Sequence, residues 1–149
     1  MKNQDYRAVI SIDASPAEAF NAISSVSEWW TANTEGRSEK RDDVFTVRFG
    51  ETHVTFRIRE VVSNRKIVWQ VTDCFLHWLK DKKEWIDTKI IFEVSEKKGT
   101  TQVSMTHVGL VPGIECYEGC AEGWNHYVKE SLFRLITEGK GMPERVKAA

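Results

Sequence analysis

Apolar and polar residues alternate along several stretches of the chain, a pattern that predicts β-strands with one buried and one solvated face. In the first stretch, residues 6–13, apolar side chains occupy alternate positions from Tyr6 to Ile12. Further strands are predicted over residues 44–49, 53–62, 66–75, 85–94 and 100–108. Because short turns join most of these later strands, we expect an antiparallel sheet.

A helical pattern follows the first predicted strand. Ser15 is the predicted N-cap, Pro16 occupies the first helical position, and Glu18 completes a capping box. This helix should run to about Ile23, and the segment VSEWW (26–30) predicts a short second helix or turn.

A second helical pattern lies near the C-terminus, where apolar residues recur at intervals of three and four. The helix should begin between Glu115 and Cys120 and end at Gly139 and Gly141, with Pro143 beyond. A helix of about 20 residues is roughly 30 Å long, enough to cover the apolar face of a curved sheet. Its predicted core-facing stripe consists of Trp124, Tyr127, Val128, Ser131, Leu132, Leu135 and Ile136.

The order of these elements predicts an α+β fold, in which a curved antiparallel sheet wraps around the long C-terminal helix. One or two short helices follow the first strand. We expect that strand to pair with the last one, because this pairing covers an otherwise open sheet edge. The length of 149 residues fits a single domain over residues 1–149, with residues 140–149 as a loose tail.

Composition and charge argue against several classes of protein. Hydrophobic residues make up 41% of the chain, which is typical of a globular protein. The net charge of −1 does not favour nucleic-acid binding, which usually needs a basic patch. No apolar run approaches the roughly 20 residues of a membrane span, and residues 1–9 lack a signal-peptide core. We therefore expect a cytoplasmic protein with no nucleic-acid partner and no membrane span.

The chain has three cysteines, Cys74, Cys116 and Cys120. An odd number at this length does not resemble a secreted disulfide scaffold, so we expect reduced, buried thiols. Cys116, Cys120 and His126 are close in sequence, yet common structural zinc sites use four ligands at other spacings. We expect neither a metal nor a cofactor.

Several large side chains fall on the predicted inward faces of the sheet and the long helix. One interpretation is an ordinary core. The other is a pocket for an amphipathic molecule, because buried Trp and Tyr rings carry polar tips that need partners. Gly123, beside Trp124, would leave room for a ligand or let the helix approach a strand. The apolar candidates for ligand binding are Phe56, Trp69, Phe92, Met105, Trp124 and Tyr127.

A second group of inward residues is polar. If the turns set the strand registers, Phe56, Asp73, Thr88 and His107 form one row across four strands, beneath Trp124. Asp73, Thr88 and His107 could then orient a ligand. Alternatively, Asp73 and His107 could act as general acid and base, or bond to loop backbone and do no chemistry.

Aromatic residues outside these faces suggest further roles. One ring of the adjacent pair Trp29 and Trp30 should pack under the sheet, and the other could gate a pocket or join a partner surface. Phe133 lies on the side of the helix away from Trp124, where an exposed ring would indicate a homodimer contact.

The chain resembles the START-like (SRPBCC) superfamily, and within it the family of the activator of heat shock protein 90 ATPase. The segments that carry this resemblance extend over nearly the whole chain. They are VISIDASPAEAFNAI (9–23), the WW pair (29–30), FRIREVVSNRKIVWQV (56–71), DTKIIFEV (87–94), TQVSMTHVGL (101–110) and GWNHYVKESLFRLI (123–136).

This resemblance implies a helix-grip fold, like that of the birch-pollen allergen, with a cavity between the sheet and the C-terminal helix. The superfamily includes lipid carriers, hormone receptors, cyclases and a chaperone co-factor, so the fold alone does not define a function. The leading hypothesis is non-enzymatic binding of a small hydrophobic or amphipathic molecule. The alternatives are a cyclase-like or hydrolase-like enzyme that uses His107 or Asp73, and a chaperone co-factor or other interaction module.

Overall fold

The computed structural model describes residues 5–144. Within this range, seven strands form one antiparallel sheet in the order β1-β7-β6-β5-β4-β3-β2. The strands are β1 (Tyr6–Ile12), β2 (Thr34–Gly36), β3 (Val44–Phe49), β4 (Thr52–Val62), β5 (Lys66–Phe75), β6 (Lys89–Lys97) and β7 (Thr100–Val108). The first strand pairs with the last, as the sequence predicted. The short strand β2 was not predicted, and the strand expected over residues 85–94 begins only at Lys89.

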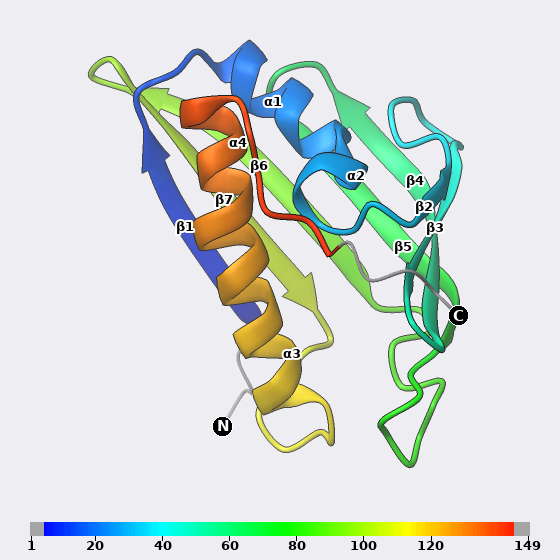
Figure 1. Ribbon diagram of the computed structural model, residues 1–149. Helices are drawn as coiled ribbons and strands as arrows, with labels where there is room; N and C mark the ends of the chain where they lie inside the picture. The colour runs from blue at the N-terminus through cyan, green and yellow to red at the C-terminus, as the bar shows by residue number, and fades with distance from the viewer. Residues whose placement is uncertain (1–4, 145–149) are drawn as a thin grey trace.

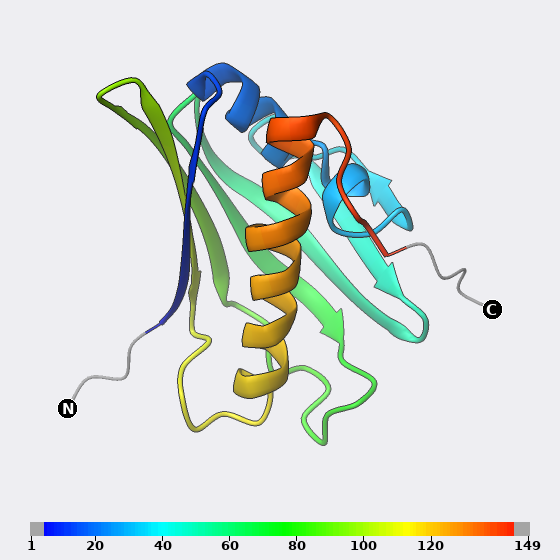
Figure 2. The same ribbon diagram turned by 60° about the vertical axis from the view of Figure 1, so that its left-hand side comes forward.

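The helices lie on one face of the curved sheet (Figures 1 and 2). They are α1 (Pro16–Ser24), α2 (Val26–Trp29) and a long C-terminal helix made of α3 (Tyr117–Trp124), η1 (Asn125–Leu132) and α4 (Phe133–Glu138). The predicted α+β helix-grip architecture is therefore confirmed. The capping box of α1 is also present, because Ser15 and Glu18 each accept a hydrogen bond from the other's backbone N–H.

The middle of the long helix is π-helical, which the sequence analysis did not predict. The apolar residues that this helix buries are spaced by four, from Cys120 through Trp124 and Val128 to Leu132 and Ile136. In a regular α-helix each step of four rotates by about 40°, so this stripe would wind around the helix. The wider turns of a π-helix rotate less per residue and bring the stripe back toward the sheet.

Trp69 lies at the centre of a solid aromatic core. Its ring centroid is 5.0 Å from those of Phe45 and Phe92 and 5.4 Å from that of Phe56. Trp29, fully buried, stacks on the same ring at 6.5 Å. This packing fills the space beneath the middle of the sheet.

The C-terminal segment after Gly139 returns along the molecule and pairs with the residues after α2. Ala32 N–H donates to the carbonyl of Glu144 and Glu144 N–H donates to that of Trp30, both at 2.8 Å. Ser131 in η1 accepts a hydrogen bond from the backbone N–H of Met142. The predicted loose tail is therefore wrong for residues 140–144, and its remainder, 145–149, lies outside the described residues.

Phe133 is packed against the core and only partly accessible. The exposed ring that would have indicated a homodimer contact is not found. No helix in the described part of the chain is long and apolar enough to cross a membrane.

Candidate ligand pocket

A largely apolar pocket of about 240 Å³ lies beside the first turns of the long helix. One wall is α3, the opposite wall is formed by the ends of β3 and β4, and the loop between β5 and β6 closes a third side. The lining residues are Trp30, Phe49, Thr52, Val54, Leu76, Trp78, Trp85, Gly119, Cys120, Gly123, Trp124 and Tyr127.

Two glycines on α3 keep this space open. A Cβ atom placed on Gly119 or Gly123 would meet no other atom within 4 Å. Glycine in a helix costs about 1 kcal/mol relative to alanine, and here neither close packing nor a positive φ requires it. The sequence-based expectation that Gly123 leaves room beside Trp124 agrees with this geometry.

Aromatic rings in contact with one another form most of the wall. The Trp124 centroid lies 4.8 Å from that of Trp30 and 6.1 Å from that of Trp85. Trp30 continues the wall to Phe49 at 5.8 Å. Trp78 is 55% exposed and marks the open side of the pocket.

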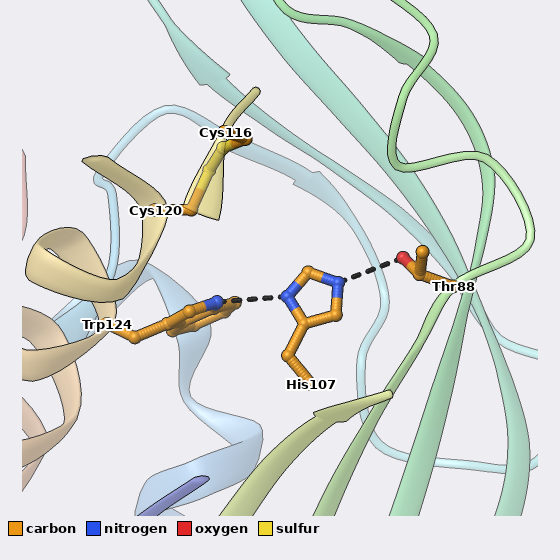
Figure 3. Close-up of a disulfide and its surroundings, with 5 residues drawn as sticks. All are labelled: Thr88, His107, Cys116, Cys120 and Trp124. Atoms are coloured by element: carbon orange, nitrogen blue, oxygen red, sulfur yellow. Dashed lines mark hydrogen bonds between the residues drawn. A yellow bond between two sulfur atoms is a disulfide. The ribbon is translucent and has the colours of Figure 1, made fainter. Parts of the chain in front are cut away.

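Behind Trp124, a chain of hydrogen bonds joins the helix to the sheet and the β5–β6 loop (Figure 3). Trp124 Nε1 donates to His107 Nδ1 at 3.1 Å. Because an indole nitrogen only donates, Nδ1 of His107 must be the acceptor, and the ring proton sits on Nε2. His107 Nε2 then donates to Thr88 Oγ1 at 2.9 Å, and Thr88 donates to the carbonyl oxygen of Trp85 at 2.7 Å.

His107 is held as a neutral imidazole by its surroundings. It is fully buried, and burial lowers its pKa from 6.5 to about 3. Both ring nitrogens already have protein partners, so neither is available to a substrate. The predicted proximity of Thr88, His107 and Trp124 is confirmed, but the arrangement does not favour acid–base chemistry by His107.

Asp73 does not join this group, and the predicted row across four strands is wrong. A bulge at Thr72 interrupts the pairing of β4 with β5, so that Thr55 faces Asp73 while Phe56 faces Val71. Beyond a bulge, the inward and outward sides of a strand exchange. Cys74 therefore points inward in place of Asp73, which is exposed and pairs with Lys83 at 3.0 Å. Hydrogen bonding to Lys83 lowers the pKa of the Asp73 carboxyl.

The predicted apolar candidates divide into two groups. Trp124 and Tyr127 line the pocket, whereas Phe56, Trp69, Phe92 and Met105 are fully buried in the core and do not. The space around Trp69 and Phe92, two of the candidates for ligand binding, is filled by protein, and the open space lies nearer the start of the helix. His107 and Thr88 lie behind the wall and are not part of its lining.

Sequence reasoning missed several lining residues. Leu76, Trp78 and Trp85 come from the β5–β6 loop. The sequence analysis left Leu76 and Trp78 between two predicted strands and placed Trp85 at the start of the second one. Two tryptophans in one loop were the available signal. Large apolar rings on a loop between strands indicate that the loop packs over another apolar surface or a binding site. One ring of the pair Trp29 and Trp30 was expected to pack under the sheet and the other to gate a pocket or join a partner surface. Trp29 packs in the core, and Trp30 lines the pocket.

Cys116 and Cys120 form a disulfide at the start of α3 (Figure 3). The expectation of reduced thiols is therefore wrong for this pair. The reason lies in local geometry, because the turn between Cys116 and α3 places the two Cα atoms 5.5 Å apart, within the range for a disulfide. Cys74 is a free buried thiol, and burial raises its pKa.

Glu115 anchors the β5–β6 loop to the segment that precedes α3. Its carboxylate accepts hydrogen bonds from the backbone N–H groups of Lys80, at 2.8 and 3.0 Å, and of Asp81 at 3.2 Å. Lys82 Nζ donates to the carbonyls of His77 and Leu79, both at 2.8 Å, which fixes the turn. The loop that carries two pocket tryptophans is thus held in place from both sides.

The described residues contain no cluster of three or more His, Cys, Asp or Glu side chains that could hold a metal ion. The arrangement is suited to enclosing an apolar molecule between aromatic rings.

Residues 13–137 match the family described as activator of Hsp90 ATPase homolog 1-like protein. The chain belongs to this family. No curated protein matches the chain.

Solved structures with the same fold extend over nearly the whole chain. The Aha1 dimer from Colwellia psychrerythraea has a TM-score of 0.75 and 23% identity, covering 95% of this chain and 100% of that one. The protein SSP2350 from Staphylococcus saprophyticus has a TM-score of 0.69 and 17% identity, covering 97% of each chain. DynU16, from the dynemicin biosynthetic locus, has a TM-score of 0.70 and 15% identity over 94% of this chain and 49% of that one. At these identities the similarity shows a common fold.

Proposed function

We propose that this protein binds a small hydrophobic or amphipathic molecule, without chemical conversion, in the pocket between α3, the sheet and the β5–β6 loop. The observation that carries this proposal is the open space beside Gly119 and Gly123, walled by aromatic rings. A pocket of this kind, apolar with a few polar groups, is typical of small-molecule sites.

The polar groups near the pocket support binding more than catalysis. No carboxylate or imidazole is among the described lining residues. His107 has both nitrogens engaged, and Asp73 is exposed on the outer face of the sheet. The enzyme alternative would therefore need another acid or base, because general acid–base catalysis requires a group within hydrogen-bond reach of the substrate.

The binding proposal is tested with the neutral fluorescent probe N-phenyl-1-naphthylamine, whose emission rises in apolar surroundings. We expect saturable binding to the wild type and to Gly123→Ala, and loss of binding in Gly123→Leu, whose side chain would occupy the pocket. Lys129→Leu places the same side chain on an exposed part of the helix and should leave binding unchanged. Equal binding by Gly123→Leu and Lys129→Leu would place the probe elsewhere and contradict the proposal.

A second candidate function follows from the family itself, whose description names an activator of the Hsp90 ATPase. In that case the protein would act as a chaperone co-factor through its surface. The test is the ATPase rate of Hsp90 from the same host, measured with and without this protein. A rate that rises on addition of the Gly123→Leu variant as well as the wild type would support a co-factor role independent of the pocket.

A further inference from the structure

We infer that the pocket selects neutral, flat aromatic molecules of about two fused rings. This inference rests on the proposed binding function and specifies its ligand class. Three features of the pocket lead to it: volume, wall and charge.

The volume limits the size of the ligand. The pocket measures about 240 Å³. A dry cavity of about 150 Å³ is enough to bind benzene, and sites for drug-sized molecules begin near 300 Å³. A ligand larger than one ring and smaller than a drug-sized molecule fits this interval, whereas a long acyl chain would extend far outside.

The wall favours a flat ligand. Six of the lining side chains are aromatic: Trp30, Phe49, Trp78, Trp85, Trp124 and Tyr127. Aromatic pairs gain more than the burial of their area alone, and they prefer offset-stacked or edge-to-face contact. A planar ring system can make both kinds of contact with this wall, while a flexible chain makes neither.

The charge of the lining excludes an ionised ligand. No lysine, arginine, aspartate or glutamate is among the described residues that line the pocket. Cys120 is bonded to Cys116, and burial raises the pKa of Tyr127, so both are uncharged at neutral pH. A carboxylate or ammonium group in this pocket would lose water without gaining a charged partner, which disfavours it.

The inference is tested by titrating four probes at pH 7.5 into wild-type protein and following the indole N–H signals by NMR. The probes are 2-acetylnaphthalene, naphthalene, 2-naphthoate and 1-dodecanol. We expect 2-acetylnaphthalene and naphthalene to bind most tightly, because both are neutral and flat, and 2-naphthoate and 1-dodecanol to bind more weakly. The Trp85 N–H signal should shift with either neutral naphthalene because its ring lines the pocket, whereas the Trp69 signal serves as an internal control.

Tighter binding of 2-naphthoate or 1-dodecanol than of 2-acetylnaphthalene to wild type would overturn the inference, and this comparison does not depend on the folding of a variant. If only 1-dodecanol binds, the binding function stands and the ligand class is wrong. If no probe binds, both are wrong.

Discussion

Trp124 on the long helix and His107 on the last strand are joined by a buried hydrogen bond of 3.1 Å. This bond fixes the tautomer of the imidazole and places one face of the pocket at a defined distance from the sheet. The same imidazole continues to Thr88, so a single neutral ring connects the helix, the sheet and the β5–β6 loop.

The stability of the protein should depend on pH through His107. Its pKa is about 3 in the folded protein and near 6.5 in the unfolded chain, so between these values the unfolded chain binds a proton that the folded protein does not. The free energy of unfolding should therefore fall as pH falls from 6.5 toward 3, with a slope from this group of up to about 1.4 kcal/mol per pH unit.

Urea unfolding at pH 7, 5.5 and 4.5 measures this dependence. His107→Gln should be less stable than the wild type at pH 7 but show a shallower decline toward pH 4.5. His77→Gln, at an exposed histidine, is the matched control and should follow the wild type. Parallel curves for the wild type and His107→Gln would show that this imidazole does not titrate as its burial requires.

The disulfide should stabilise the start of the long helix. Its closed loop is short, with a sequence separation of four, so chain entropy predicts a contribution of only about 2 kcal/mol. Reduction, or the double replacement Cys116→Ser and Cys120→Ser, should lower the melting temperature and speed amide exchange in α3. The melting temperature of Cys74→Ser should still fall when reductant is added, whereas that of the double variant should not change. A wild type unchanged by reductant would argue against the bond.

Replacing Asp73 should have little effect. Its carboxylate is exposed and pairs with Lys83 on the outer face, and exposed ion pairs contribute roughly 0–1 kcal/mol. Asp73→Asn should therefore change neither the urea midpoint appreciably nor the affinity for 2-acetylnaphthalene. A large loss of affinity would restore the hypothesis that this residue orients the ligand.

The C-terminal segment should be an integral part of the fold. Ser131 Oγ donates to the carbonyl of Trp29 at 2.7 Å and accepts from the N–H of Met142 at 2.6 Å, in a buried position. Ser131→Ala leaves both groups unpaired and should cost about 1–3 kcal/mol in urea unfolding. Gly141→Ala should also destabilise, because its Cβ would lie 2.4 Å from the carbonyl oxygen of Glu28. Ser27→Ala, at an exposed site, should stay close to wild type.

Much of the architecture follows from periodicity alone. The two-residue period located most of the strands, and the capping box at Ser15 located the start of α1, because both signals are local. The π-helical centre also had a signal, in the spacing of four from Cys120 to Ile136, which fits an α-helix poorly. A pattern that departs steadily from 3.6 residues per turn is evidence for a change in helix type.

The pocket was harder to locate from sequence, for two physical reasons. A bulge at Thr72 reverses which residues of β5 point inward after that position, and no residue type there marks a bulge. The wall also depends on a loop, residues 76–88, whose position is set by backbone hydrogen bonds to Glu115 rather than by a periodic pattern. Of the rings predicted to bind the ligand, Phe56, Trp69 and Phe92 belong to the core, and only Trp124 and Tyr127 line the pocket.

The central claim is that the space beside Gly123 holds a small molecule in the living cell. Native mass spectrometry of protein purified from its own host tests this directly, with wild type, Gly123→Leu and Lys129→Leu prepared in parallel. The account predicts a bound mass of a small neutral compound on the wild type and Lys129→Leu, and none on Gly123→Leu. A wild type that carries no compound, or the same bound mass on all three proteins, would contradict it.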